Sequence, residues 1–394
     1  MKTIIVDHDN DTELAARGRF NAIVPLLLTY GAEPLHTWSE NANDEGIISP
    51  SELNQHFGKD VNILYTLTSR IPEDDPALDG ANGDRRWLHE ISTEIPKHIV
   101  EYANSGKLHI AYFVGEIINI TPKEILETVN QQLELAGLLP EAITVYIPNF
   151  QLHELGVSYI KFISIFEMSY YGYLAKAGLP ISKNVIQEVN MERRNKKFTC
   201  LNHLSKAHRM CFAGSLYNTG RHLKGYFSYI GQDFIDGEPG TLLKNLSFRQ
   251  FENHIPFLLD TDDAEAVNYH WRVKKPFFND AYWNFVTESF YADYYSLTEK
   301  TFKPLVNLQP FIIVGAPGSL ETLHKLGYQT FSSVIDESYD YELNHNKRME
   351  KLIALSYRLT DMTDAQHMRI MRKIEPILKH NQEVFFNKDW KEML

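Results

Sequence analysis

Short apolar segments alternate with longer segments of helical pattern along most of this chain, and this alternation constrains the fold more than any other feature. Runs typical of buried strands cover residues 3–6, 63–65, 107–114, 142–147, 198–201, 283–286 and 311–314. Helical patterns occupy residues 13–30, 91–104 and 122–138. Strands that alternate with helices predict a mostly parallel, doubly wound sheet, so the expected fold class is α/β.

The chain has 394 residues, which is more than one hydrophobic core usually holds, so we expect two domains. A basic run opens after Met191 and leads into a second series of strands. We therefore predict an N-terminal α/β domain at residues 1–190 and a second domain at 191–345. Residues 346–394 carry apolar side chains at helical spacing among many Lys and Arg, and we expect a C-terminal helical segment there.

Composition narrows the class of protein. The net charge of −12 argues against a protein that coats DNA or RNA generally, although it leaves room for a local basic cleft. The two cysteines, Cys200 and Cys211, fit no zinc signature and indicate a reducing compartment. The start of the chain has no secretory pattern, and no apolar run approaches 18 residues. We therefore expect a cytoplasmic protein without a membrane span.

One stretch has the composition of an anion-binding helix start. Thr298 is a suitable N-cap, with Glu299 and Lys300 in the first turn. Such a start offers N–H groups and the positive end of the helix dipole to an anion, and Lys300 adds a full charge. Glu299 can accept hydrogen bonds from two vicinal ribose hydroxyls. Gly315 and Gly318, after a predicted strand, would let the backbone approach a ligand. This pattern predicts a nucleotide-diphosphate site at the carboxyl ends of parallel strands; the alternative is a solvated helix start with an ion pair.

A second group of polar residues follows the strand at 198–201. Asn202 comes at its end, and Lys206, His208 and Arg209 lie one to two helical turns later. Arg can clamp a diphosphate with two hydrogen bonds, and His can donate a third. The alternative is a basic surface helix with a histidine that is satisfied in the core.

These groups belong to an ordered set of motifs that resembles a group of phage-encoded glycosyltransferases, whose second half is similar to the α1,3-fucosyltransferases. The set comprises Asn202 with His208-Arg209, Phe285-Val-Thr-Glu288-Ser289, Thr298-Glu299-Lys300, Pro310 to Gly318 and Asp336-Glu-Ser-Tyr-Asp340. It covers roughly residues 196–345. The family has a Phe-Glu-Asn-Ser box, whereas the stretch at 285–289 lacks the Asn and carries an extra residue.

The resemblance implies a GT-B architecture, with two Rossmann-like domains that face each other across a cleft and C-terminal helices that pack back. It implies a nucleotide-diphosphate sugar as the donor substrate, bound in the C-terminal domain. By position, Glu299 would hold the ribose, while Lys300 and Arg209 would bind the diphosphate. The other residues expected to bind the donor are Asn202, His208, Glu288, Ser289, Thr298 and Lys303. Cations and a helix dipole would stabilise the leaving group, so no metal or other cofactor is expected.

A base from the N-terminal domain would deprotonate the acceptor hydroxyl. The candidates are Asp7, His8 and Glu116, since each follows a predicted strand. An acid at such a position is also a common turn or helix cap.

Two other patterns favour different chemistry. Leu258-Leu259-Asp260-Thr261-Asp262 has the strand-then-DxD form of metal-dependent GT-A transferases, and also reads as an acidic turn. Asp7 to Asp11 resembles a phosphotransferase aspartate loop, but its required Thr or Val is displaced by one position.

Two acceptors are compatible with a phage enzyme in the host cytoplasm. One is a hydroxymethylated base of double-stranded phage DNA, which the enzyme would have to reach or flip. Local basic stretches favour it: Arg193-Arg194, Lys196-Lys197, Arg272 to Lys275 and Arg369 to Lys379. The other is a glycan or lipid-linked saccharide, on which aromatic residues could stack: Tyr170 to Tyr173, Tyr291, Tyr294 and Tyr295. A further alternative is a non-catalytic nucleotide- or DNA-binding protein of the same fold.

Overall fold

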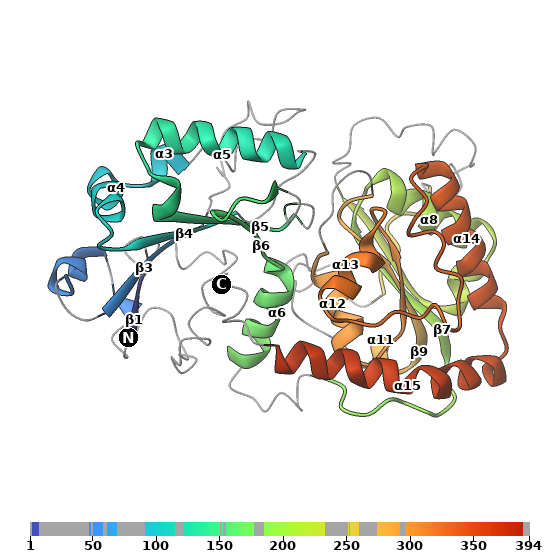
Figure 1. Ribbon diagram of the computed structural model, residues 1–394. Helices are drawn as coiled ribbons and strands as arrows, with labels where there is room; N and C mark the ends of the chain where they lie inside the picture. The colour runs from blue at the N-terminus through green and yellow to red at the C-terminus, as the bar shows by residue number, and fades with distance from the viewer. Residues whose placement is uncertain are drawn as a thin grey trace. The chain divides into compact units, whose positions relative to one another are not determined.

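The computed structural model describes residues 2–7, 47–48, 50–57, 61–68, 91–114, 121–149, 152, 155–176, 185–232, 251, 253–259, 274–291 and 297–388. The chain divides into two compact units (Figure 1). The first contains Met1–Gly178 and Asp389–Leu394, and the second contains Leu179–Lys388. Each unit is built around a parallel sheet.

The sheet of the first unit has the strand order β2-β1-β3-β4-β5-β6, and every pairing in it is parallel. Strand β5 is buried along its whole length and β4 is buried after His109, as the apolar runs at 107–114 and 142–147 predict. The strands are β1 (Lys2–Asp7), β2 (Ile47–Ile48), β3 (Val61–Thr68), β4 (His109–Phe113), β5 (Ile143–Ile147) and β6 (Ile160–Phe162).

Helices connect these strands, and α5 shows how local sequence sets their bounds. Thr121 and Glu124 form a capping box, with Pro122 at the first helical position. Gly137 ends the helix in the left-handed conformation. The helices of this unit are η3 (Pro50–Gln55), α3 (Ile91–Glu94), α4 (Lys97–Asn104), α5 (Pro122–Ala136), η6 (Pro140–Ala142) and α6 (Ile165–Lys176).

The sheet of the second unit has the order β10-β9-β7-β8, again with parallel pairing only. Both β9 and β10 are buried along their whole length. Because parallel strands end at the same edge of a sheet, the polar residues that follow β7 and β9 lie close together. The strands are β7 (Lys196–Leu204), β8 (Tyr226–Gln232), β9 (Ala281–Thr287) and β10 (Phe311–Val314).

Two long helices complete the second unit. Helix α14 starts at the N-cap Asn344, and α15 starts with a capping box formed by Thr363 and Gln366. The Tyr357 hydroxyl donates to the Ser215 carbonyl and so joins α14 to α8. The helices of this unit are α8 (Ala207–Asn218), η8 (Arg221–Lys224), α11 (Lys275–Asn279), α12 (Glu299–Val306), α13 (Ser319–Lys325), α14 (His345–Asp361) and α15 (Asp364–Asn387).

The predicted α/β class is confirmed, since both sheets are parallel and alternate with helices. The sequence interpretation missed the strands β2, β6 and β8 and the helices α6, α11 and α13. The helix expected at 13–30 lies outside the described residues. In the described part of the chain, no helix has the length and apolar character needed to cross a membrane.

Candidate functional site

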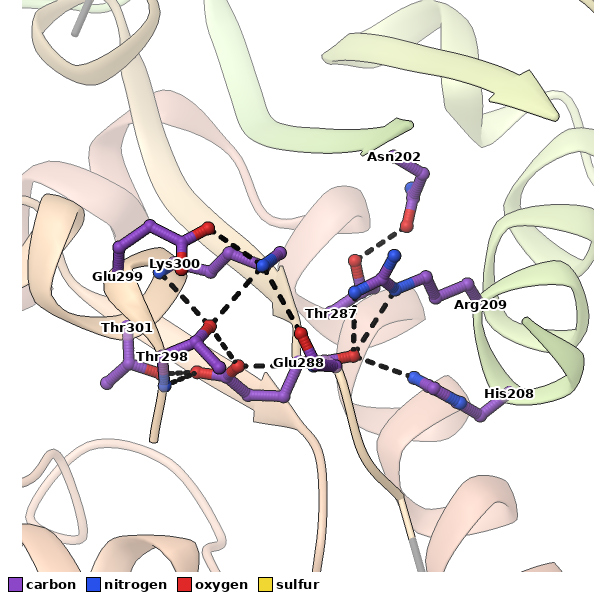
Figure 2. A network of polar contacts seen from close by, with 10 residues as sticks. Asn202, His208, Arg209, Thr287, Glu288, Thr298, Glu299, Lys300 and Thr301 are labelled. Carbon is purple, nitrogen blue, oxygen red and sulfur yellow. Dashed lines mark hydrogen bonds and ion pairs between the residues drawn. The ribbon is translucent and has the colours of Figure 1, made fainter. Parts of the chain in front are cut away.

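The predicted site residues of the second unit gather where β7 and β9 end (Figure 2). The Thr287 hydroxyl, at the end of β9, donates to Asn202 Oδ1 of β7 at 2.6 Å. The next residue, Glu288, continues the pairing with β10 through its N–H, which donates to the Val314 carbonyl at 3.0 Å. Glu288 is therefore held at the centre of this edge of the sheet.

The carboxylate of Glu288 is the hub of a buried network, and the residue is only 1% exposed. It accepts from the Thr298 N–H at 3.1 Å and from the Thr298 and Thr301 hydroxyls at 2.5 Å each. The Ser289 N–H donates to it at 3.2 Å. These contacts hold the first turn of α12 against the end of β9. The Glu288 carboxylate, which was expected to bind the donor, is therefore engaged by groups of the protein itself.

Thr298 is the N-cap of α12, as predicted, and its hydroxyl accepts from the Lys300 N–H at 3.4 Å. The expectation that this helix start presents its polar groups to an external anion needs correction. The Thr298 N–H and hydroxyl already donate to Glu288, whose carboxylate lies at the positive end of the helix dipole. The Glu288 carboxylate therefore occupies the Thr298 donors that an external anion was expected to use.

Glu299 and Lys300 lie side by side in the first turn of α12 (Figure 2). Lys300 Nζ is 2.8 Å from Glu299 Oε1 and 3.4 Å from the hydroxyl oxygens of Ser289 and Thr298. The Lys300 side chain is 31% exposed and that of Glu299 is 5% exposed. The ion pair between neighbours is present, and it brings the predicted ribose acceptor and the predicted phosphate cation into contact.

His208 and Arg209 both face the backbone carbonyl of Glu288. His208 Nε2 lies 2.9 Å from that oxygen, and Arg209 donates to it from Nε and Nη2 at 3.2 and 3.0 Å. Since a carbonyl can only accept, His208 must carry its proton on Nε2. Burial, together with the nearby cations led by Arg209, holds the pKa of His208 well below its usual value. His208 is therefore a neutral donor.

Positive charge is concentrated around this carbonyl. Lys206 immediately precedes α8, is buried, and places its Nζ 4.8 Å from the centre of the Phe290 ring. Lys206, Arg209 and Arg348 each lower the pKa of His208 electrostatically. The first turn of α8 receives no hydrogen bond from the side chain of its N-cap. This end of the sheet can therefore stabilise an anion.

Lys303 lies one turn after Glu299 in α12. Burial lowers the pKa of Lys303 to about 8, although the nearby Glu299 carboxylate opposes the shift. Its charge therefore titrates within the range in which enzymes are commonly assayed.

Packing inside the protein explains why the loop after β10 contains Gly315. A Cβ atom at Gly315 would lie 3.2 Å from Glu288 Cβ, so the glycine lets the backbone approach that residue. The carboxylate of Asp340 accepts from the Leu320 and Glu321 N–H groups at 3.0 and 3.2 Å and caps α13. The Asp336–Asp340 motif thus fixes the helix that follows this loop.

Sequence reasoning did not place two residues in this network: it did not single out Thr301, and it assigned Tyr291 to acceptor contact. Thr301 occupies the third helical position of α12 and donates to Glu288 across 13 residues, so no local pattern marks it. Tyr291 stacks on His208, with ring centroids 5.3 Å apart and planes 10° apart. No local pattern marks Tyr291, because its partner is distant in sequence.

The expected catalytic bases belong to the first unit. The backbone of Asp7 ends β1, opposite Thr66 of β3, but its side chain is not among those described. His8 and Glu116 lie outside the described residues, as do Asp260 and Asp262 of the DxD pattern.

Several residues assigned to acceptor contact have other roles. Arg194 is buried and donates to the Ala281 and Asn190 carbonyls, so its assignment to a basic surface is wrong. Lys197 and Arg193 form ion pairs with Asp364 at the start of α15. Tyr170 and Tyr291 are buried and cannot stack on an external sugar in this conformation. The side chain of Tyr173 is not among those described, and Tyr294 and Tyr295 lie outside the described residues, as does Arg272.

Among the described residues, no cluster of three or more His, Cys, Asp or Glu side chains is arranged to hold a metal ion. No protein-family model and no curated protein matches the sequence.

Solved structures of sugar-phosphate synthases resemble the chain distantly. One is a trehalose-6-phosphate structure from E. coli with bound UDP-2-fluoro glucose, at 11% identity and a TM-score of 0.41, covering 99% of this chain and 98% of that one. Another is an α,α-trehalose-phosphate synthase (UDP-forming) from Burkholderia xenovorans with glucose-6-phosphate, at 12% identity and a TM-score of 0.39, covering 87% and 74%. An α,α-trehalose-phosphate synthase (UDP-forming) from Burkholderia vietnamiensis has 11% identity and a TM-score of 0.37, and the match covers 100% of this chain and 98% of that one.

Proposed function

We propose that the protein is a glycosyltransferase that moves a sugar from a nucleotide-diphosphate sugar to an acceptor hydroxyl. The observation that carries this proposal is the meeting of Arg209, Glu299 and Lys300 around Glu288 at one edge of a parallel sheet. Arg209 is buried and Lys300 is partly exposed, and a diphosphate would accept charge-assisted hydrogen bonds from both cations.

In the proposed complex, Arg209 and Lys300 bind the diphosphate and Glu299 accepts from the ribose hydroxyls. Lys206, buried before α8, adds a further positive charge. Asn202 and Ser289 line the same edge of the sheet. As the bond from the sugar to the diphosphate breaks, negative charge grows on the leaving phosphate, and fixed cations stabilise it without reorganisation.

His208, Glu288 and Thr298 support this site from within, because their polar atoms are engaged with one another and with neighbouring backbone. Lys303 is proposed as a phosphate contact whose charge depends on pH. For the base that deprotonates the acceptor, we retain Asp7, His8 and Glu116 as candidates.

For the acceptor we propose a hydroxymethylated base of phage duplex DNA. The exposed basic side chains of α15, Arg369 and Arg372, are the observation that favours it, since they could contact phosphates. Of the aromatic residues assigned to a saccharide acceptor, Tyr170 and Tyr291 are buried, which gives that alternative less support.

A thermal-shift screen of the intact protein with UDP, GDP and TDP and their sugar conjugates tests the donor. A ligand that binds only the folded state raises the melting temperature by mass action. We then expect the stabilising sugar conjugate to release its nucleoside diphosphate when duplex DNA containing hydroxymethylated bases is added. Binding without turnover on DNA or saccharide acceptors would favour a non-catalytic nucleotide-binding protein, and a screen without any stabilising ligand would contradict the donor proposal.

A further inference from the structure

Three side chains stack in a row between helix α14 and the candidate site. The guanidinium carbon of Arg348 lies 4.2 Å from the centre of the Tyr291 ring. The Tyr291 ring in turn stacks on His208 at 5.3 Å, with an angle of 10° between the planes. His208 faces the Glu288 carbonyl, which also accepts from Arg209. The row therefore ends at the atom that orients Arg209.

Arg348 is itself fixed at several points. It is 1% exposed, donates from Nη1 to the Glu342 carbonyl at 2.9 Å, and donates from Nη2 to the Tyr291 carbonyl. The Tyr291 hydroxyl donates to the His345 carbonyl at 2.9 Å, in the same first turn of α14. Both the ring and the backbone of Tyr291 are thus held by the start of α14.

We infer that Arg348 is a positioning residue for the diphosphate-binding group, acting through Tyr291 and His208 on Arg209. The inference rests on the proposed donor site. The contacts of Arg348 with the ring and the carbonyl of Tyr291 fix that residue, and the stack carries the effect on to His208 and the Glu288 carbonyl. If Arg348 is lost, the Tyr291 ring is no longer held, and His208 loses the ring on which it stacks. His208 and Arg209 share the Glu288 carbonyl as acceptor, so a shift of His208 changes the orientation of Arg209.

Lysine cannot replace arginine here. The planar guanidinium covers an aromatic ring and donates in two directions at once, whereas an ammonium group is compact and strongly hydrated. The variant Arg348→Lys keeps the positive charge and therefore isolates the positioning effect from simple electrostatics.

The second unit offers a matched control in Arg194. It is 2% exposed, its guanidinium carbon lies 5.7 Å from the Tyr282 ring centre, and it donates to the Ala281 carbonyl at 2.7 Å. These contacts lie at the beginning of β9, whereas Glu288 follows its end. Arg194→Lys should therefore disturb packing as much as Arg348→Lys does, but leave the candidate site intact.

The test is calorimetric titration of UDP and GDP into the full-length wild type and both variants, at a temperature where all three are folded. We expect Arg348→Lys to raise the Kd of the nucleotide that binds wild type by about tenfold. Arg194→Lys should change this Kd by less than about twofold. Equal binding by Arg348→Lys and wild type, or equal weakening in both variants, would overturn the inference. If Arg348→Lys does not fold, Tyr291→Leu removes the middle of the stack and should give the same loss.

A second readout separates failure of this inference from failure of the proposed function. The imidazole NMR signals of His208, assigned with His208→Gln, report its stacking and its Nε2 proton without any ligand. They should shift in Arg348→Lys and stay unchanged in Arg194→Lys. If neither nucleotide binds wild type, the donor proposal fails, and unchanged His208 signals in Arg348→Lys would overturn the positioning role as well.

Discussion

The Thr301 hydroxyl donates to the carboxylate of Glu288 at 2.5 Å, across a separation of 13 residues. Together with the Thr298 contacts, it closes the first turn of α12 against the end of β9. The orientation of Glu299 and Lys300 therefore depends on a buried carboxylate that is itself engaged inside the protein. Several consequences of this arrangement can be measured.

Glu288→Gln should destabilise the fold. The substituted amide keeps one accepting oxygen, so at least one of the donors from Thr298 and Thr301 loses its partner in a buried site. We expect a loss of about 1–3 kcal/mol in the free energy of unfolding, measured with urea. Glu321→Gln is the control, since that carboxylate is half-exposed and pairs with Lys325 on the surface. Equal stability of Glu288→Gln and wild type would contradict the network.

Lys300→Met should weaken nucleoside diphosphate binding, because it removes the cation placed between Glu299 and Ser289. A hydrogen bond to a charged group contributes about 1.5–3 kcal/mol, so the Kd should rise by about tenfold or more. Lys325→Met removes a comparable lysine, paired with Glu321 at 3.0 Å in α13, and should leave the Kd unchanged. Calorimetry of both variants measures the difference, and similar affinities would refute the role of Lys300.

Lys303 should make diphosphate binding depend on pH. Lysine is charged below its pKa, and burial lowers the pKa of Lys303 to about 8. The cation is therefore present at pH 7 and largely lost at pH 9, so affinity should fall between these values. Lys303→Arg keeps its charge throughout and should remove most of this fall. A pH profile shared by the variant and wild type would exclude Lys303 as a phosphate contact.

His367 should make stability depend on pH in acid. It accepts from Trp283 Nε1 at 3.3 Å, and burial lowers its pKa from 6.5 to about 4. Below pH 6.5 His367 is protonated in the unfolded chain but stays neutral in the folded protein. The free energy of unfolding therefore falls as the pH drops towards 4. The total loss amounts to about 3 kcal/mol at most, at about 1.4 kcal/mol per pKa unit.

His367→Asn keeps an acceptor for Trp283 and cannot titrate. Urea unfolding at pH 7 and pH 5 should therefore show a smaller acid loss for this variant than for wild type. The same loss in both proteins would show that the pKa of His367 does not differ between the folded and the unfolded protein.

Local patterns predicted the elements whose signals are strong. The apolar run at 311–314 coincides with β10, and Pro122 marks the first residue of α5. Helix α6 was missed because its own apolar residues are distributed all around the helix axis. Its sequence therefore has no polar stripe with helical period. Strand β8 was missed because its aromatic residues are interrupted by Ser228 and Gly231.

The site was predictable only in its local part. The N-cap at Thr298 follows from its neighbours in sequence, and the structure has it. The contact between Arg348 and Tyr291 spans 57 residues and depends on how α14 packs, so no spacing rule could indicate it. The basic run at 193–197 looked like a surface, but Arg194 is buried, and its Nη1 and Nη2 donate to the backbone carbonyls of Ala281 and Asn190. Composition alone cannot distinguish these two environments.

A crystal structure of the protein with the nucleoside diphosphate that stabilises it most tests the central claim directly. The account predicts that the diphosphate lies within hydrogen-bond distance of Arg209 and Lys300, with the ribose hydroxyls at Glu299. A nucleotide bound elsewhere in the chain, with the Glu288 network untouched, would contradict it.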